Sequence, residues 1–242
     1  MSFNTLVFGV YPYVALLVCL VGSWARFDLA QYTWKAGSSQ MLSKKGMRVY
    51  SNLFHIGVLF LFFGHTVGML TPHFVYEPFM AAGAKQLLAM VSGGIAGTLG
   101  FIGLTILLHR RLSDVRIRAH SRFSDIAILW LLWLQLLLGL ATIPLSARHM
   151  DGSMMMALAE WAQRIVTFRG GAAELLAEAG WVFKAHMFLG MSIFLVFPFT
   201  RLVHVWSGFG TLVYLLRPYQ LVRSRRLGLP ASSARRDAKP GH

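Results

Sequence analysis

The sequence has few charged residues and only one cysteine. Charged side chains make up 13% of the 242 residues and hydrophobic ones 56%, whereas a soluble domain typically carries about 25% charged residues. So few charges cannot coat a globule in water, and so apolar a chain cannot stay unfolded, which excludes a soluble enzyme and a disordered chain. The lone Cys19 excludes an internal disulfide, an iron–sulfur cluster and a haem attached through a Cys-x-x-Cys-His motif, because each needs more than one thiol.

Five stretches of the sequence are long and apolar enough to cross a membrane. A spanning helix needs roughly 20 mostly apolar residues, and the stretches cover residues 3–24, 49–70, 87–108, 126–145 and 181–206. We therefore predict an all-α fold, a polytopic membrane bundle of five transmembrane helices. The first stretch is interpreted as a retained helix, because it has neither a basic n-region nor a clear small-residue cleavage site.

Two further segments have their own patterns. Residues 154–168 place apolar side chains at helical spacing, which predicts a short helix lying on the outer surface. Residues 226–242 are basic and poor in apolar side chains, which predicts a disordered tail. Residues 1–225 are accordingly predicted to form one membrane domain.

The positive charge is distributed unevenly about the five predicted spans. The net charge is +14, and 18 of the 23 Lys and Arg residues lie in the first loop, the third loop and the C-terminal end. In a five-helix bundle these segments share one side, and an excess of Lys and Arg marks the cytoplasmic side. We therefore predict a multi-pass protein of the cytoplasmic membrane with an outer N-terminus and a cytoplasmic C-terminus. The basic residues reflect this topology rather than a nucleic-acid partner.

Four histidines lie within or at the ends of spans, where polar side chains are costly and usually functional. His55 and His65 belong to the second span, and His186 and His204 to the fifth. Antiparallel spans place His65 with His186, here called the outer pair, and His55 with His204, the inner pair. Two facing histidines can provide both axial ligands of a haem iron, and bundle cores hold such cofactors.

The distance between the two histidines along the helix differs between the second and the fifth span. At 1.5 Å per residue the two histidines of the second span are separated by about 15 Å and those of the fifth by about 27 Å. We expect a kink at Pro198, or helix tilt, to absorb the difference.

Other protein classes can use the same histidines. A haem-free transporter or proton relay is one, although the predicted spans contain no Asp or Glu and no half-helix repeats. A passive anchor for cytoplasmic subunits is another, but it needs no paired histidines. A visible difference spectrum separates these classes from a cytochrome.

Residues near the ends of the third span are further candidates. Arg111, beside Arg110, can pair with a propionate of the inner haem, because guanidinium matches carboxylate; the alternative is a plain cytoplasmic charge. Lys85 lies at the outer end, at the depth of the outer pair. It is either a snorkelling anchor, which the residues alone favour, or a hydrogen-bond partner of a quinone head group.

Small residues on the second and fifth spans let a flat macrocycle or a neighbouring helix approach closely. These residues are Gly57, Gly64, Gly68 and Gly190.

Uninterrupted blocks of sequence resemble a known family over residues 8–225. The blocks include Tyr11-Pro12-Tyr13, Ser51-Asn52-Leu53-Phe54-His55-Ile56-Gly57, Gly64-His65, Gly68-Met69-Leu70-Thr71-Pro72-His73, His149-Met150-Asp151-Gly152 and Phe197-Pro198-Phe199. They resemble the gamma subunit of respiratory nitrate reductase, the membrane cytochrome b of a quinol-oxidising complex.

The resemblance implies a function and a set of site residues. It implies two non-covalent b-type haems, with His65 and His186 on the outer iron and His55 and His204 on the inner one. It places quinol oxidation at the outer haem, where Lys85 matches the family's lysine. It implies two cytoplasmic partners, an iron–sulfur beta subunit and a molybdenum-containing alpha subunit. The chain would then carry the quinol-oxidising part of a nitrate reductase (quinone), and the alternative is the homologous cytochrome b of another complex, of the sulfur-cycle or heterodisulfide type.

Overall fold

The computed structural model describes residues 2–30, 33–34 and 46–207, and these residues form helices and connections without a strand. Lys35, Lys44 and Lys45 of the first loop lie outside the described residues, as does the predicted tail 226–242. The predicted all-α fold class is confirmed for the described part of the chain.

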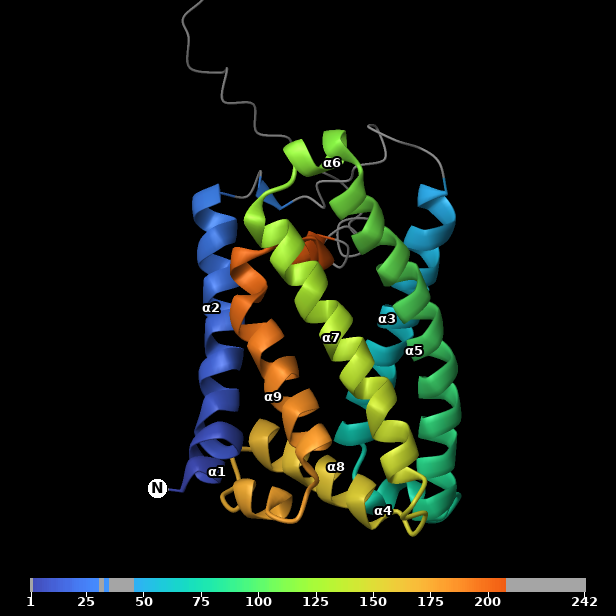
Figure 1. Cartoon of the computed structure of the whole chain (residues 1–242). Coiled ribbons are helices and arrows are strands. Elements are labelled where there is room, and N and C mark those ends of the chain that lie inside the picture. Colours follow the sequence, from blue (N-terminus) through green and yellow to red (C-terminus); the bar gives the residue numbers. More distant parts are fainter. Residues whose placement is uncertain (1, 31–32, 35–45, 208–242) are drawn as a thin grey trace, which may run out of the picture. The chain divides into compact units, whose positions relative to one another are not determined.

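Five helical stretches are long and apolar enough to span a membrane, as predicted (Figure 1). The first combines α1 (Phe3–Thr5), a π-helix (Leu6–Val10) and α2 (Tyr11–Ala30). The others are α3 (Met47–Leu70), α5 (Ala82–Ser113), α7 (Phe123–Ser146) and α9 (Trp181–Val196). The predicted direction of these spans across the membrane stays a prediction.

The spans pack in a defined order of neighbours. α3 packs along α5, α5 against α7, α7 against α9, and α9 against α2, whereas α3 and α9 do not form a packed pair within the described residues. Small residues explain the close packing of α3 and α5: a Cβ atom on Gly57 would lie 2.6 Å from the Ala96 oxygen and from the Gly100 nitrogen. Gly57 therefore serves helix packing, one of the two roles predicted for it.

Short helices lie at the two ends of the bundle, which we call the α6 end and the α8 end (Figure 1). α6 (Val115–Ala119) joins α5 to α7. α8 (Ser153–Val166) confirms the short helix predicted within residues 154–168, whereas its position on the outer surface stays a prediction. α4 (His73–Tyr76) and a 3-10 turn (Ala173–Leu176) lie at the α8 end.

The apolar side of α8 packs on the start of the first span. Phe8, Trp161, Ile165 and Leu176 belong to one buried cluster. Within it, Trp161 Nε1 donates a hydrogen bond of 2.9 Å to the Phe8 carbonyl oxygen. This contact ties α8 to the π-helix of the first span.

The fifth span differs from the prediction of one helix over residues 181–206. α9 ends at Val196 and is followed by two 3-10 turns, Phe197–Phe199 and Arg201–Val203, with extended backbone at Thr200 between them. Pro198 lacks the N–H that a continuing helix needs. The expected disturbance of the helix at Pro198 is therefore confirmed. The prediction of one continuous helix over residues 181–206 was wrong. The position of His204 does not follow from a regular helical rise along α9.

Candidate functional site

The four histidines meet in the two predicted pairs. The ring centroids of His65 and His186 are 6.3 Å apart, and those of His55 and His204 are 6.4 Å apart. Two imidazoles bound to one metal ion through bonds of about 2.0–2.1 Å have ring centres about 6 Å apart. The spacing of each pair therefore suits one metal ion between its two rings.

Three of the four rings make the same hydrogen bond. Nδ1 of His55, of His65 and of His204 each lies close to a backbone carbonyl oxygen of its own helix or turn. The distances are 2.7 Å to Ser51, 2.7 Å to Leu61 and 2.6 Å to Arg201. A ring nitrogen facing a carbonyl carries the proton, so Nε2 of the neutral ring keeps its lone pair. Histidines that bind metals usually have this arrangement, because the hydrogen bond fixes ring orientation and tautomer.

The ring of His186 has different surroundings. Its Nδ1 is buried and has no hydrogen-bond partner within the described residues, and the same holds for Gln135 Oε1. Gln135 Nε2 lies 3.5 Å from His186 Nε2. Buried polar atoms without a partner are costly, so this part of the site fits an additional bound group.

Glycines lie next to the two histidines of the outer pair. A Cβ atom on Gly139 of α7 would lie 3.0 Å from His186 Cε1, so the backbone of α7 forms one wall of the outer site. A Cβ atom on Gly64 or Gly68, either side of His65 on α3, would meet no atom within 4 Å. The free space beside His65 suits a flat macrocycle, whereas Gly57 is already used for packing on α5.

The donor set limits which metal group can bind. Across residues 2–30, 33–34 and 46–207 no group of three or more His, Cys, Asp or Glu side chains lies together. A structural or catalytic zinc site needs three or four protein ligands. A haem iron needs only the two axial ligands that each pair offers. The residues present therefore fit haem better than a bare metal ion.

Lys85 lies at the start of α5 at the α8 end. Its Nζ atom is buried, has no hydrogen-bond partner among the described residues, and lies 3.6 Å from the ring centroid of Tyr76. A cation over an aromatic face is held without using its hydrogen-bond donors. Burial and the carboxylate of Glu77 raise the pKa of Tyr76 above its ordinary value, so the phenol stays neutral. The amine of Lys85 thus keeps donors available, although its contact in the structure is Tyr76 rather than His65.

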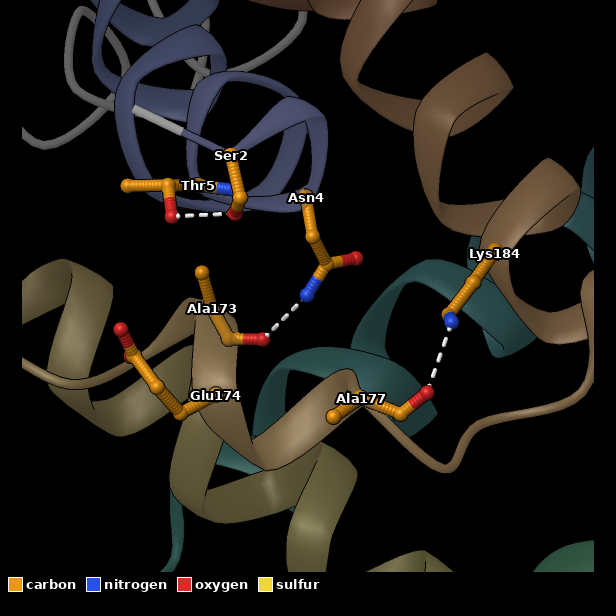
Figure 2. Close-up of a pocket in the computed structure, with 7 residues that line it drawn as sticks. All are labelled: Ser2, Asn4, Thr5, Ala173, Glu174, Ala177 and Lys184. Atoms are coloured by element: carbon orange, nitrogen blue, oxygen red, sulfur yellow. Dashed lines mark hydrogen bonds between the residues drawn. The ribbon is translucent and has the colours of Figure 1, made fainter.

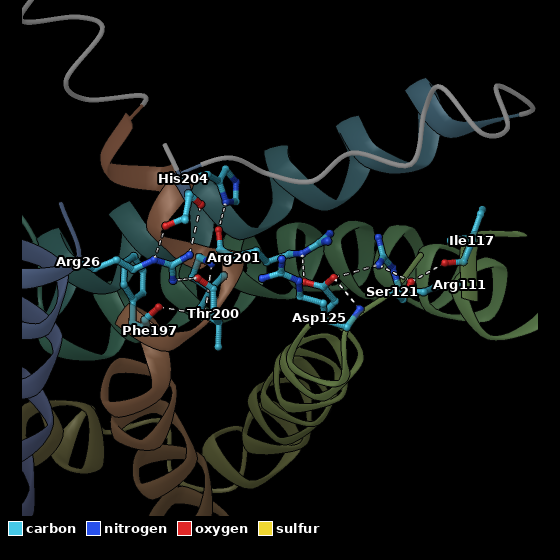
Figure 3. Close-up of polar contacts among 12 residues, drawn as sticks. Arg26, Arg111, Ile117, Ser121, Asp125, Phe197, Thr200, Arg201 and His204 are labelled. Atoms are coloured by element: carbon cyan, nitrogen blue, oxygen red, sulfur yellow. Dashed lines mark hydrogen bonds and ion pairs between the residues drawn. The ribbon is translucent and has the colours of Figure 1, made fainter. Parts of the chain in front are cut away.

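Arg111 lies at the α6 end and is 7% exposed. Its Nη1 donates to Ser121 Oγ at 2.8 Å and lies 3.8 Å from Asp125 Oδ2, as Figure 3 shows. Asp125 also accepts a bond of 3.0 Å from Arg201 Nε. The predicted pairing of Arg111 with a haem propionate stays a prediction beside these protein contacts.

The pocket drawn in Figure 2 is separate from the predicted site residues. It is lined at the α8 end by residues of the first span, the 3-10 turn and α9, namely Ser2, Asn4, Thr5, Ala173, Glu174, Ala177 and Lys184. None of the four paired histidines lines it, nor does Lys85.

Comparison with known proteins identifies the family. The profile of the nitrate reductase gamma subunit family matches residues 4–225. The chain belongs to the nitrate reductase gamma subunit family. It is 57% identical over 223 residues to the respiratory nitrate reductase 2 gamma chain of Escherichia coli, covering 92% of this chain and 98% of that protein. It is 37% identical over 221 residues to the nitrate reductase gamma chain of Bacillus subtilis, covering 91% of this chain and 98% of that protein. The resemblance drawn from the sequence blocks is confirmed, and this gamma-family chain is an integral multi-pass membrane protein.

Sequence reasoning missed two polar residues near the histidine pairs of this gamma-family chain. Gln135 beside His186 is one, and its signal was a carboxamide in the middle of an apolar span. Arg26 is another: its Nη1 donates to the carbonyl oxygens of Pro198 at 2.7 Å and Thr200 at 2.8 Å. Figure 3 shows Arg26 beside Thr200. This contact joins residues more than 170 positions apart, so no local pattern could indicate it.

Proposed function

We propose that this chain is the dihaem cytochrome b subunit of a respiratory nitrate reductase. In this role it oxidises quinol near the outer face and passes electrons through two b-type haems to the cytoplasmic side. The observation that carries the proposal is the spacing of the two histidine pairs, 6.3 Å and 6.4 Å between ring centroids. The names of the relatives, gamma chains of nitrate reductases, favour this complex over a sulfur-cycle or heterodisulfide reductase.

The histidines would hold the two haems. His65 and His186 would bind the outer iron, and His55 and His204 the inner one. Bound haem supplies one-electron transfer chemistry. With two imidazoles on each iron, neither haem would keep an open position for oxygen.

Lys85 would bind the quinol. Its unpaired ammonium can donate a hydrogen bond to a quinol oxygen while the ring of Tyr76 holds it in place. Oxidation of quinol to quinone releases two electrons and two protons, and the protons leave to the outer side. Inward movement of electrons and outward release of protons builds a membrane potential, which stores about 2.3 kcal/mol per charge at 100 mV.

The partners would bind at the α6 end. We expect an iron–sulfur beta subunit to accept the electrons there and a molybdenum-containing alpha subunit to reduce nitrate. Arg111, which lies at this end in α5, would bind a propionate in addition to Asp125, since guanidinium has five N–H donors. In this proposal the chain would carry electrons across the membrane, and the partner subunits would reduce nitrate.

A reduced-minus-oxidised visible spectrum of the purified complex tests this function. The wild-type protein should show two b-type signals. His65→Ala should remove the outer signal and quinol-dependent reduction while the inner signal remains. His120→Ala, an exposed histidine beyond α6, is the matched control and should keep both signals. Loss of both haems, or of neither, in His65→Ala would contradict the assigned pairs.

A further inference from the structure

His204 is linked by hydrogen bonds to a group of charged side chains at the α6 end. Its Nδ1 donates to the Arg201 carbonyl oxygen at 2.6 Å, and the side chain of the same Arg201 bonds to Asp125 at 3.0 Å. The second carboxylate oxygen of Asp125 lies 3.8 Å from Arg111 Nη1. Figure 3 shows this line of contacts from His204 to Arg111. Arg201 therefore connects the histidine to the carboxylate through its backbone and its side chain.

The group has a surplus of positive charge with little water around it. Two guanidinium groups share the one carboxylate of Asp125, and the side chains of Arg111, Asp125 and Arg201 are 8%, 15% and 18% exposed. Arg26 adds a third guanidinium to the segment that carries His204. Charges away from water are screened weakly by solvent and salt. The charges of Arg111, Asp125 and Arg201 therefore exert a strong electrostatic effect on any group bound at His204.

We propose that the charge cluster of Arg111, Asp125 and Arg201 raises the reduction potential of the inner haem and so directs electrons from the outer site to the inner one. This inference rests on the proposed function, because it concerns the iron expected between His55 and His204. Reduction adds one negative charge to that site, and a net positive cluster stabilises the reduced state. Arg201 and Asp125 are positioning residues, since they act on the iron through His204 and through the field rather than as ligands.

The outer pair has different surroundings. The polar side chain next to His186 is the neutral Gln135, and the ammonium of Lys85 lies over the ring of Tyr76. An electron thus meets more positive surroundings at the inner pair than at the outer one. This difference in charge gives the transfer its inward direction.

Redox titration of the two haem signals in membranes that contain the whole complex tests the inference. Asp125→Asn removes a negative charge and should raise the inner potential, whereas Arg111→Gln removes a positive charge and should lower it. We expect each reduction equilibrium to change by about tenfold, which corresponds to ~59 mV for one electron. Arg201→Lys keeps the charge and should leave the inner potential near its original value. Arg148→Gln, an exposed arginine that follows α7 at the α8 end, is the matched control and should shift neither haem.

The signs of the shifts separate electrostatics from damage to packing. Opposite shifts of the inner potential in Asp125→Asn and Arg111→Gln, with a constant outer potential, support the inference. Shifts in the same direction, equal shifts of both haems, or no shift overturn it. If one variant loses the inner haem, the direction of the shift in the other decides; if both lose it, the cluster is structural and the inference is wrong. A complex without b-type haem contradicts the proposed function instead, before any potential is measured.

Discussion

Replacement of Gly57 by alanine should disturb both histidine pairs at once. A Cβ atom at this position would lie 2.6 Å from two backbone atoms of α5, and ordinary contact begins at 3.4 Å. The backbones of α3 and α5 must therefore separate by about 0.8 Å near this point. Gly57 lies between His55 and His65 on α3, so the same displacement reaches one histidine of each pair.

The cost of the substitution can be estimated from the contact. Overpacking of a close interface costs about 1–3 kcal/mol, and each kcal/mol lowers the melting temperature of a protein of this size by about 2–4 °C. We expect a loss of thermal stability in this range, together with broadened or reduced signals of both haems in the difference spectrum.

A matched control is available on the partner helix. Gly93 of α5 also lies in a span, but a Cβ atom there would meet no atom within 4 Å. Gly93→Ala should therefore keep the melting temperature and both haem signals. If Gly57→Ala behaves like Gly93→Ala in both measurements, the contact between α3 and α5 does not position the histidines.

Three further substitutions test single contacts. Trp161→Phe removes the 2.9 Å bond to the Phe8 carbonyl and should cost about 1–3 kcal/mol, measured as a lower melting temperature with both haem spectra retained. Lys85→Met should reduce the rate of haem reduction by quinol about 10- to 100-fold, because a hydrogen bond from a charged group contributes about 1.5–3 kcal/mol; reduction by dithionite should not change, and an unchanged quinol rate would refute the assignment. Gly139→Val places a side chain 3.0 Å from His186 Cε1 and should reduce the outer haem signal in the spectrum while the inner one persists; equal loss of both would show a general packing defect.

Much of the fold could be predicted from the sequence because the bilayer allows few solutions. A segment that crosses hydrocarbon must satisfy its own backbone hydrogen bonds, so a long apolar stretch becomes a helix. The predicted stretch 126–145 accordingly corresponds to α7, Phe123–Ser146, within a turn at either end. The third helix was less well bounded: α5 covers Ala82–Ser113, longer than the predicted 87–108, because its ends include the polar residues that hydropathy excludes.

The side-chain surroundings of the site could not be predicted, because they depend on contacts between distant helices. The carboxamide of Gln135 approaches His186 across the interface of α7 and α9. The bond between Arg201 and Asp125 joins positions 76 residues apart. A single sequence shows that such residues are polar and where they fall along a helix, but it does not show which partner they meet.

The difference in helical rise between the histidines of the second and fifth spans nevertheless indicated that the fifth span is not a regular helix. In a continuous helix, His204 would lie about 12 Å beyond the level of His55, if the outer pair is taken as the common reference. The structure instead brings the two rings to 6.4 Å because α9 ends at Val196 and the chain turns at Thr200. Arg26 Nη1 donates hydrogen bonds to the carbonyl oxygens of Pro198 and Thr200 in this irregular segment, where the helix cannot continue through Pro198. The end of α9 at Val196 therefore lets His204 lie at the level of His55, and Arg26 of α2 is hydrogen-bonded to the segment between Val196 and His204.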